Sequence, residues 1–243
     1  MYFDQNRATL IAQSGDLDEL AEFLASPTEQ LPEDWIEGGL AIHNPGNTQA
    51  LLNPTVVGIV EIMAAPVRSI VIERFDGQLV TLTFVAFDRR GRATVTEGVG
   101  PSEVSVTATD LSLLPALLAQ SVRLGANSVA GEPPAIPTTV GVLEHIFSES
   151  TEPTNVSDDR LRELLGSVQF AWRASGSWPD SDVDSSITVV ACGELGLWSV
   201  AAESPSEDEP SPAMPITLTP TNRKLVLEKL GDVVTGRSRT PNE

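Results

Sequence analysis

The sequence is poor in the residues that build disulfides and metal centres. Its 243 residues include one cysteine, Cys192, and two histidines, His43 and His145. A single cysteine excludes an intrachain disulfide, and Cys192 falls in an apolar run that places it in the core. The two histidines are far apart in sequence and neither has a neighbouring ligand residue, so we expect no metal site and no cofactor.

Long hydrophobic runs are absent as well. No apolar stretch approaches the ~20 residues that a membrane-spanning helix requires. The first residues also lack the basic start and apolar centre of a secretory signal. The sequence therefore predicts a cytoplasmic protein that does not insert into a membrane.

Motifs of catalysis and cofactor binding are missing too. The sequence has no G-x-S-x-G and no Walker motif. Gly98 and Gly100 lack the third glycine of a dinucleotide-binding loop and precede a strand pattern instead of a helix. Carboxylates are so abundant that no pair stands out as an acid and base. We therefore predict a protein that is not an enzyme and has no catalytic residues.

Basic residues are scarce relative to acidic ones. The 34 acidic and 15 basic residues give a formal net charge of −19. That field repels nucleic acid phosphates and anionic membranes, so we expect neither as a partner. The one basic cluster, residues 89–92, is interpreted as a solvated hairpin tip, with an acidic partner as the alternative.

Local signals place several elements in the first half of the chain. Asn53 followed by Pro54 is typical of the N-cap and first residue of a helix. The pair Asp76-Gly77 lies between alternating runs and indicates a two-residue hairpin turn, and residues 88–91 indicate a longer one. The opening residues 4–26 read as one interrupted helix or two short ones.

Two segments, residues 67–122 and 168–234, repeat one order of elements. Each has the alternation of several strands and ends in an amphipathic helix. When the two closing helices are aligned, their apolar residues coincide. The aligned pairs are Leu113 with Leu225, Leu114 with Val226, Leu118 with Leu230, and Val122 with Val234.

This repeat predicts an α+β fold that consists of a pseudo-two-fold duplicated unit, with a central antiparallel sheet and helices packed on it. The expected divisions are an N-terminal helical and loop segment at 1–50, a first half at 51–125, a linker with a short helix at 126–156, a second half at 157–236, and a frayed tail at 237–243.

The second copy departs from the first in its loops. Ser157 is its expected helix N-cap. An insert at 175–185 contains Trp178, which is either an interface residue in an exposed loop or a side chain that folds back on the sheet. An acidic loop at 203–213 is expected to be a mobile surface segment. Trp172 and Trp198 fall in strand patterns and are predicted to be core.

The order of features from Leu51 to Pro137 resembles the EspG family, the cytosolic substrate chaperones of actinobacterial type VII (ESX) secretion. A helix with a terminal proline, a strand, a short-turn sheet, a helix and a proline-rich connector follow one another as they do in that family. The segments that carry the likeness are NPTVVGIVEIMAAP, VRSIVIERFDG, LVTLTFVAFDRRGRATVTEGVGPSEVSVTA, LLPALLAQSV and EPPAIP.

The resemblance implies a non-catalytic chaperone or adaptor that binds the apolar tip of a helical secretion substrate and keeps it soluble for export. The substrate would be a PE–PPE-type pair or a WXG-type pair. In the family, the sheet, a hairpin loop and the C-terminal helical part contact the substrate. By position, the partner-binding candidates are Arg74, Phe75, Asp76, Gly77 and Gln78; Trp178 is a further candidate without family support.

Two other functions stay open on the sequence alone. The first is a structural or regulatory module that acts as a homo-oligomer. The second, less favoured, is an enzyme whose catalytic residues are dispersed along the chain.

Overall fold

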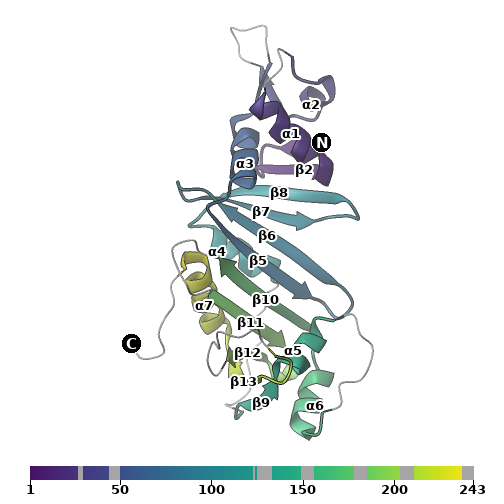
Figure 1. The fold of residues 1–243 in the computed structure, drawn as a ribbon, viewed down its shortest axis with the longest axis vertical. Helices are drawn as coiled ribbons and strands as arrows, with labels where there is room; N and C mark the ends of the chain where they lie inside the picture. The colour runs from purple at the N-terminus through teal and green to yellow at the C-terminus, as the bar shows by residue number, and fades with distance from the viewer. Residues whose placement is uncertain are drawn as a thin grey trace. The chain divides into compact units, whose positions relative to one another are not determined.

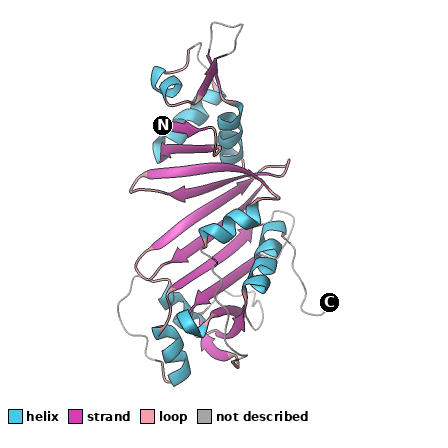
Figure 2. Ribbon diagram, turned by 180° about the vertical axis from the view of Figure 1, so that it is seen from behind, coloured by secondary structure: helices cyan, strands magenta, loops and turns pink. Residues whose placement is uncertain are grey.

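The computed structural model describes residues 1–26, 30–43, 50–122, 124, 133–148, 156–177, 185–202 and 211–236. The fold is α+β, and the strand pairs are antiparallel, as predicted (Figures 1 and 2). The described residues form two compact units. Unit 1 is built from Met1–Val71 and Thr83–Leu114 with Ser177, and unit 2 from Ile72–Leu82, Pro115–Gly176 and residues 185–236.

Unit 1 holds the antiparallel strands β1, β2, β8 and β7, which pair in that order, then residues 83–87 of β6, and a separate two-stranded ribbon, β3-β4. Three helices accompany these strands. The elements are β1 (Tyr2–Asp4), β2 (Thr9–Gln13), α1 (Ser14–Ala25), α2 (Glu33–Glu37), β3 (Ala41–His43), β4 (Ala50–Leu52), α3 (Pro54–Ala64), β6 (Val80–Phe87), β7 (Arg92–Gly98) and β8 (Glu103–Asp110).

The expected helix at the start of the chain is partly wrong. Residues 2–4 and 9–13 are strands, and only α1 is helical. Leu10 and Ala12 are buried while Ile11 between them is half-buried, as in a strand, and Thr9 at the start of the strand is buried as well. Leu10 pairs with Val106 of β8, and both belong to the core of unit 1. Five residues are too few for their period to be distinguished from that of a helix in the sequence.

Helix α3 begins as predicted. The Asn53 Oδ1 accepts the Thr55 N–H at 2.9 Å, and Pro54 is the first helical residue. Because proline lacks an N–H and its φ is already helical, it suits a position where no intrahelical bond is available. Val56 and Ile59 are buried in the core of unit 1, and α3 packs on β7 and β8.

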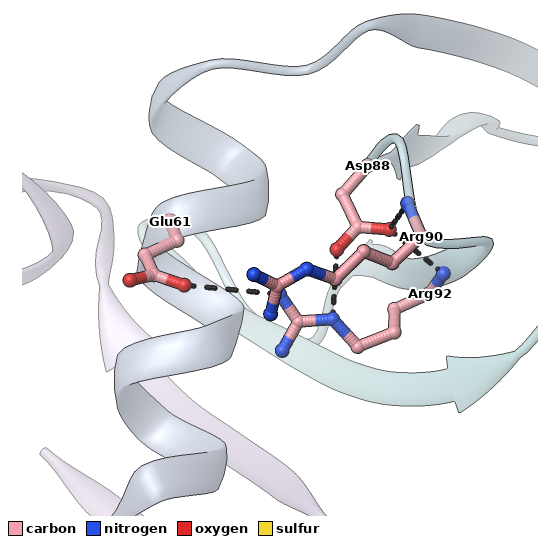
Figure 3. A network of polar contacts seen from close by, with 4 residues as sticks. All are labelled: Glu61, Asp88, Arg90 and Arg92. Atoms are coloured by element: carbon pink, nitrogen blue, oxygen red, sulfur yellow. Dashed lines mark hydrogen bonds and ion pairs between the residues drawn. The ribbon is translucent and has the colours of Figure 1, made fainter.

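Figure 3 shows how the turn between β6 and β7 is held. The Asp88 carboxylate accepts the backbone N–H groups of Arg90 and Arg92 at 2.8 and 2.9 Å, and it also accepts the Arg92 Nε–H at 2.7 Å. Arg92 extends to Glu61 on α3, with Nη2 and Oε2 3.7 Å apart. A Cβ at Gly58 would lie 3.0 Å from the Arg92 Nη1, so a glycine there leaves room for the guanidinium.

Unit 2 holds the antiparallel strands β10, β11, β12, β13 and β9, which pair in that order. The strand β5 (Arg68–Phe75) contributes its second half to unit 2. The remaining elements are α4 (Leu114–Ser121), β9 (Ile136–Thr139), α5 (Val140–Ile146), α6 (Asp159–Gly166), β10 (Phe170–Ser177), β11 (Ser185–Ala191), the 3-10 turn η1 (Gly193–Leu195), β12 (Leu197–Ala202), β13 (Pro215–Thr221) and α7 (Arg223–Thr235).

Each predicted copy contains four consecutive strands followed by a helix, namely β5 to β8 with α4 and β10 to β13 with α7. This is the order that a duplication predicts, and the duplication itself stays a prediction. The aligned helix residues are buried with one exception: Leu113 and Leu225 are 60% and 45% exposed. That aligned pair therefore does not belong to the buried face.

The core of unit 2 contains the residues expected there. Trp198 and Cys192 are buried in one cluster with Leu164 and Leu218, and Trp172 is also buried. Burial raises the pKa of the Cys192 thiol to about 12, because the charged thiolate is poorly solvated there.

We expect the Cys192 thiol to be unreactive in the folded protein, since almost no thiolate exists at pH 8. A thiol-specific reagent such as DTNB should modify it only after unfolding, at a rate that follows the unfolded fraction in urea. Rapid modification without denaturant would contradict the burial of this residue.

We expect Asp88→Asn to lower the free energy of unfolding by about 1–2 kcal/mol at pH 7, because the variant weakens charge-assisted bonds to Arg90 and Arg92. Burial alone would raise the pKa of Asp88, but these bonds outweigh it and lower the pKa. The contribution is therefore full above the ordinary carboxyl pKa of about 3.9 and is lost as the pH falls through the lower folded-state pKa. Urea titrations from pH 7 to 3 would measure the difference between the two proteins. A difference that grows on acidification would contradict this assignment.

Candidate partner-binding site

The candidates Asp76, Gly77 and Gln78 form the turn between β5 and β6. The Asp76 N–H donates to the Leu79 carbonyl at 3.3 Å, and Gly77 has φ +91°. The Asp76 Oδ1 accepts the N–H groups of Gln78 and Leu79 at 3.3 and 3.2 Å. The two central residues of the turn are thus Gly77 and Gln78, one position later than the predicted Asp76 and Gly77. Asp76 precedes them and stabilises the turn with its side chain.

Arg74 is directed to a helix end within unit 2. Its Nη1 donates to the Ser121 carbonyl, the last residue of α4, at 2.8 Å. A cation at a helix C-terminus satisfies a carbonyl that has no intrahelical partner and complements the helix dipole. Arg74 thus has a structural contact, and we do not include it in the proposed binding surface.

Phe75 lies half-buried against the core of unit 2, beside Leu165 and Val168. It also lines an open groove of about 430 Å³, together with Gly77 of the turn. We call this the α5–α6 groove, because those two helices supply its other walls. Its apolar lining consists of Phe75, Ile146, Val156, Leu165 and Val168.

The side chains of His145 and Arg162, which carry N–H donors, also line the α5–α6 groove. The Arg162 Nη2 donates to the Val156 carbonyl at 2.7 Å, and its Nη1 donates to Asp159. These contacts hold Arg162 along its own helix. The groove therefore combines an apolar base with donors along its rim, which is the usual composition of a site that seats side chains of a ligand.

Helix α6 is positioned by a cap other than the predicted Ser157. The N-cap is Asp158, whose Oδ1 accepts the N–H groups of Arg160 and Leu161 at 2.8 and 3.1 Å. A carboxylate at this position satisfies two free N–H groups and also complements the positive helix end. Leu161 and Leu164 are buried on one face of α6 and anchor it to the core.

Helix α5 is held to the sheet by Arg173 of β10. The Arg173 guanidinium bonds to Glu73 of β5 and to Glu144 of α5, and it lies 5.1 Å from the ring centre of Phe147. Burial alone would lower the pKa of Arg173, but the two carboxylates outweigh it and raise the pKa. Because Glu73 and Glu144 are 100 and 29 residues from Arg173, no local sequence pattern indicates this contact.

The structure thus brings together only part of the predicted site. Phe75 and Gly77 line the α5–α6 groove, Gln78 is exposed beside them, and Arg74 and Asp76 make structural contacts. The candidate Trp178 and most of the acidic loop lie outside the described residues. The walls from α5 and α6 are residues that the sequence did not single out.

The described part of the chain has neither a cluster of metal ligands nor a membrane-spanning helix. Within it, no three His, Cys, Asp or Glu side chains lie close enough to share a metal ion. No helix in the same part is long and apolar enough to cross a membrane.

The sequence and the fold were compared with those of known proteins. No family model matches the sequence, and no curated protein matches it. Among solved structures, the chain is similar to the Mycobacterium tuberculosis type VII secretion system chaperone EspG5, in a structure with the PE25–PPE41 dimer, with a TM-score of 0.57. This chain has the fold of EspG5. The alignment covers 93% of this chain and 95% of that one at 14% identity, so the EspG-like fold implied by the sequence is confirmed.

We expect Arg173→Gln to lower the free energy of unfolding by about 1–2 kcal/mol, because it leaves Glu73 and Glu144 without their shared cation. A double-mutant cycle with Glu144→Gln should give a coupling energy of about 0.5 kcal/mol or more. Urea titration of the four proteins measures it. Additive effects would mean that Arg173 does not hold α5.

Proposed function

We propose that this protein is a chaperone or adaptor of type VII secretion, which binds a helical substrate in the cytoplasm and keeps it soluble for export. The expected substrate is a PE–PPE-type pair, with a WXG-type pair as the alternative. The shared fold with EspG5, which was solved with a PE25–PPE41 dimer, supports this proposal. The same likeness favours a binding role without catalysis.

The observation that carries the proposal is the α5–α6 groove at the predicted hairpin. Its apolar base can receive side chains that project from the end of a helix, as in other complexes in which a helix docks in a groove. Its volume of about 430 Å³ suits a few side chains of a partner rather than a whole helix. Leu79, 60% exposed in the adjacent turn, adds apolar surface next to Gly77.

Phe75→Asp is a poor test of this site because Phe75 also packs against the core of unit 2. Gly166 offers a cleaner one. It lines the groove at the last residue of α6, and a Cβ there would meet no heavy atom within 4 Å. A side chain added at Gly166 therefore starts in open space beside the groove.

We expect Gly166→Trp to weaken substrate binding by about tenfold or more, because the indole takes the place of the partner's side chains. The matched control is Gly15→Trp on α1 of unit 1, where an added Cβ also meets no heavy atom within 4 Å. Co-expression of each variant with helical pairs encoded beside its gene, followed by size-exclusion chromatography with light scattering, measures the complex.

The outcomes of this experiment separate the alternatives. Loss of the complex with Gly166→Trp alone supports the groove as the binding site. Equal binding by both variants would exclude the groove, whereas no complex with any helical pair, together with a symmetric dimer of the wild type, would contradict the chaperone role.

A further inference from the structure

A second open groove lies in unit 1, between α1 and α2. Its base includes Phe23 and Trp35, whose rings meet edge to face with their centres 5.2 Å apart and an interplanar angle of 72°. Ala25 and Pro32 extend the apolar lining, and the groove has a volume of about 510 Å³. Phe23 is half-buried and Ala25 is exposed, so apolar surface stays accessible along this groove.

The charged side chains that line this α1–α2 groove are both carboxylates, Glu19 and Glu22. Both residues are exposed, and neither has an ion-pair partner among the described residues. The surrounding sequence adds no compensating cation. From Ala8 to Val67 there is no lysine or arginine, although this stretch holds nine of the 34 acidic residues.

We propose that the α1–α2 groove docks a basic amphipathic helix of another protein. The apolar lining requires aliphatic side chains from the partner, and the carboxylates at its rim require lysine or arginine beside them. Complementary charge raises the association rate and selects against acidic partners. This site lies in unit 1 and is additional to the substrate site proposed for unit 2.

Other occupants fit the groove less well. Anionic membranes and nucleic acids are repelled by the carboxylates. A second copy of this chain offers the basic hairpin turn at residues 89–92, which is not helical, and a short basic stretch of α7, where Arg223 and Lys224 lie beside Leu227. A dimer formed through such unlike surfaces would leave one groove free at one end and one basic surface free at the other, and it would extend into a chain of molecules.

The probe is a fluorescein-labelled 14-residue peptide of leucine and lysine in helical amphipathic order, titrated with the full chain and followed by anisotropy. We expect binding that weakens as salt is raised, and no binding of the analogue with glutamate in place of lysine. Glu19→Gln/Glu22→Gln should weaken binding by about fivefold or more.

The matched control is Glu163→Gln/Glu194→Gln, which removes two exposed carboxylates from unit 2. It should change the affinity by less than about twofold. Equal losses in the two double variants would mean that the peptide senses only the overall charge, and the proposal would be wrong.

A second measurement locates the peptide independently of charge. With 5-fluorotryptophan incorporated, the ¹⁹F signal of Trp35, assigned with Trp35→Phe, should shift on peptide addition more than the signals of Trp172 and Trp198. Binding without a shift at Trp35 would overturn the proposal. So would self-association of the chain that Glu19→Gln/Glu22→Gln abolishes, because the groove would then hold a second copy.

Discussion

The α5–α6 groove depends on the guanidinium of Arg173, which ties α5 to the sheet of unit 2. Helix α5 has seven residues, too few to be stable by its own hydrogen bonds. Its position therefore follows from tertiary contacts: Leu143 and Ile146 in the core, and Glu144 on Arg173. Since Glu73 shares the same guanidinium, the strand that leads into the Asp76 turn and the helix that faces it are held by one cation.

Secondary structure could be predicted from the sequence where it is determined by neighbouring residues. Asn53 and Pro54 mark the start of α3, and the alternation of residues 80–87 marks a strand, because these signals depend on neighbours in the chain. The prediction failed where elements are short. The sequence predicts a helix where β2 lies and a linker where β9 lies, because four or five residues carry too little periodicity and their pairing partners lie far away in sequence.

The candidate site also combines a local turn, which the sequence indicates, with residues that are distant in the chain. The turn at Asp76 was recognisable from its composition, and it does contribute Phe75 and Gly77 to the groove. The facing walls come from α5, α6 and the residues beside them, at positions 145–168, far along the chain from Phe75 and Gly77. Only the folded chain brings them together. The contact of Arg74 with the last residue of α4 also depends on the folded chain, because Ser121 is 47 positions away.

Strand β9 has a consequence for how the protein behaves at high concentration. It is the last strand in the order of unit 2, pairs with β13, and contains Pro137 in a run of only four residues. An edge strand can pair with strands of other molecules. A short edge strand that contains a proline, which has no N–H to donate, is a poor template for such pairing. A segment that reads as a connector thus also protects the sheet against aggregation.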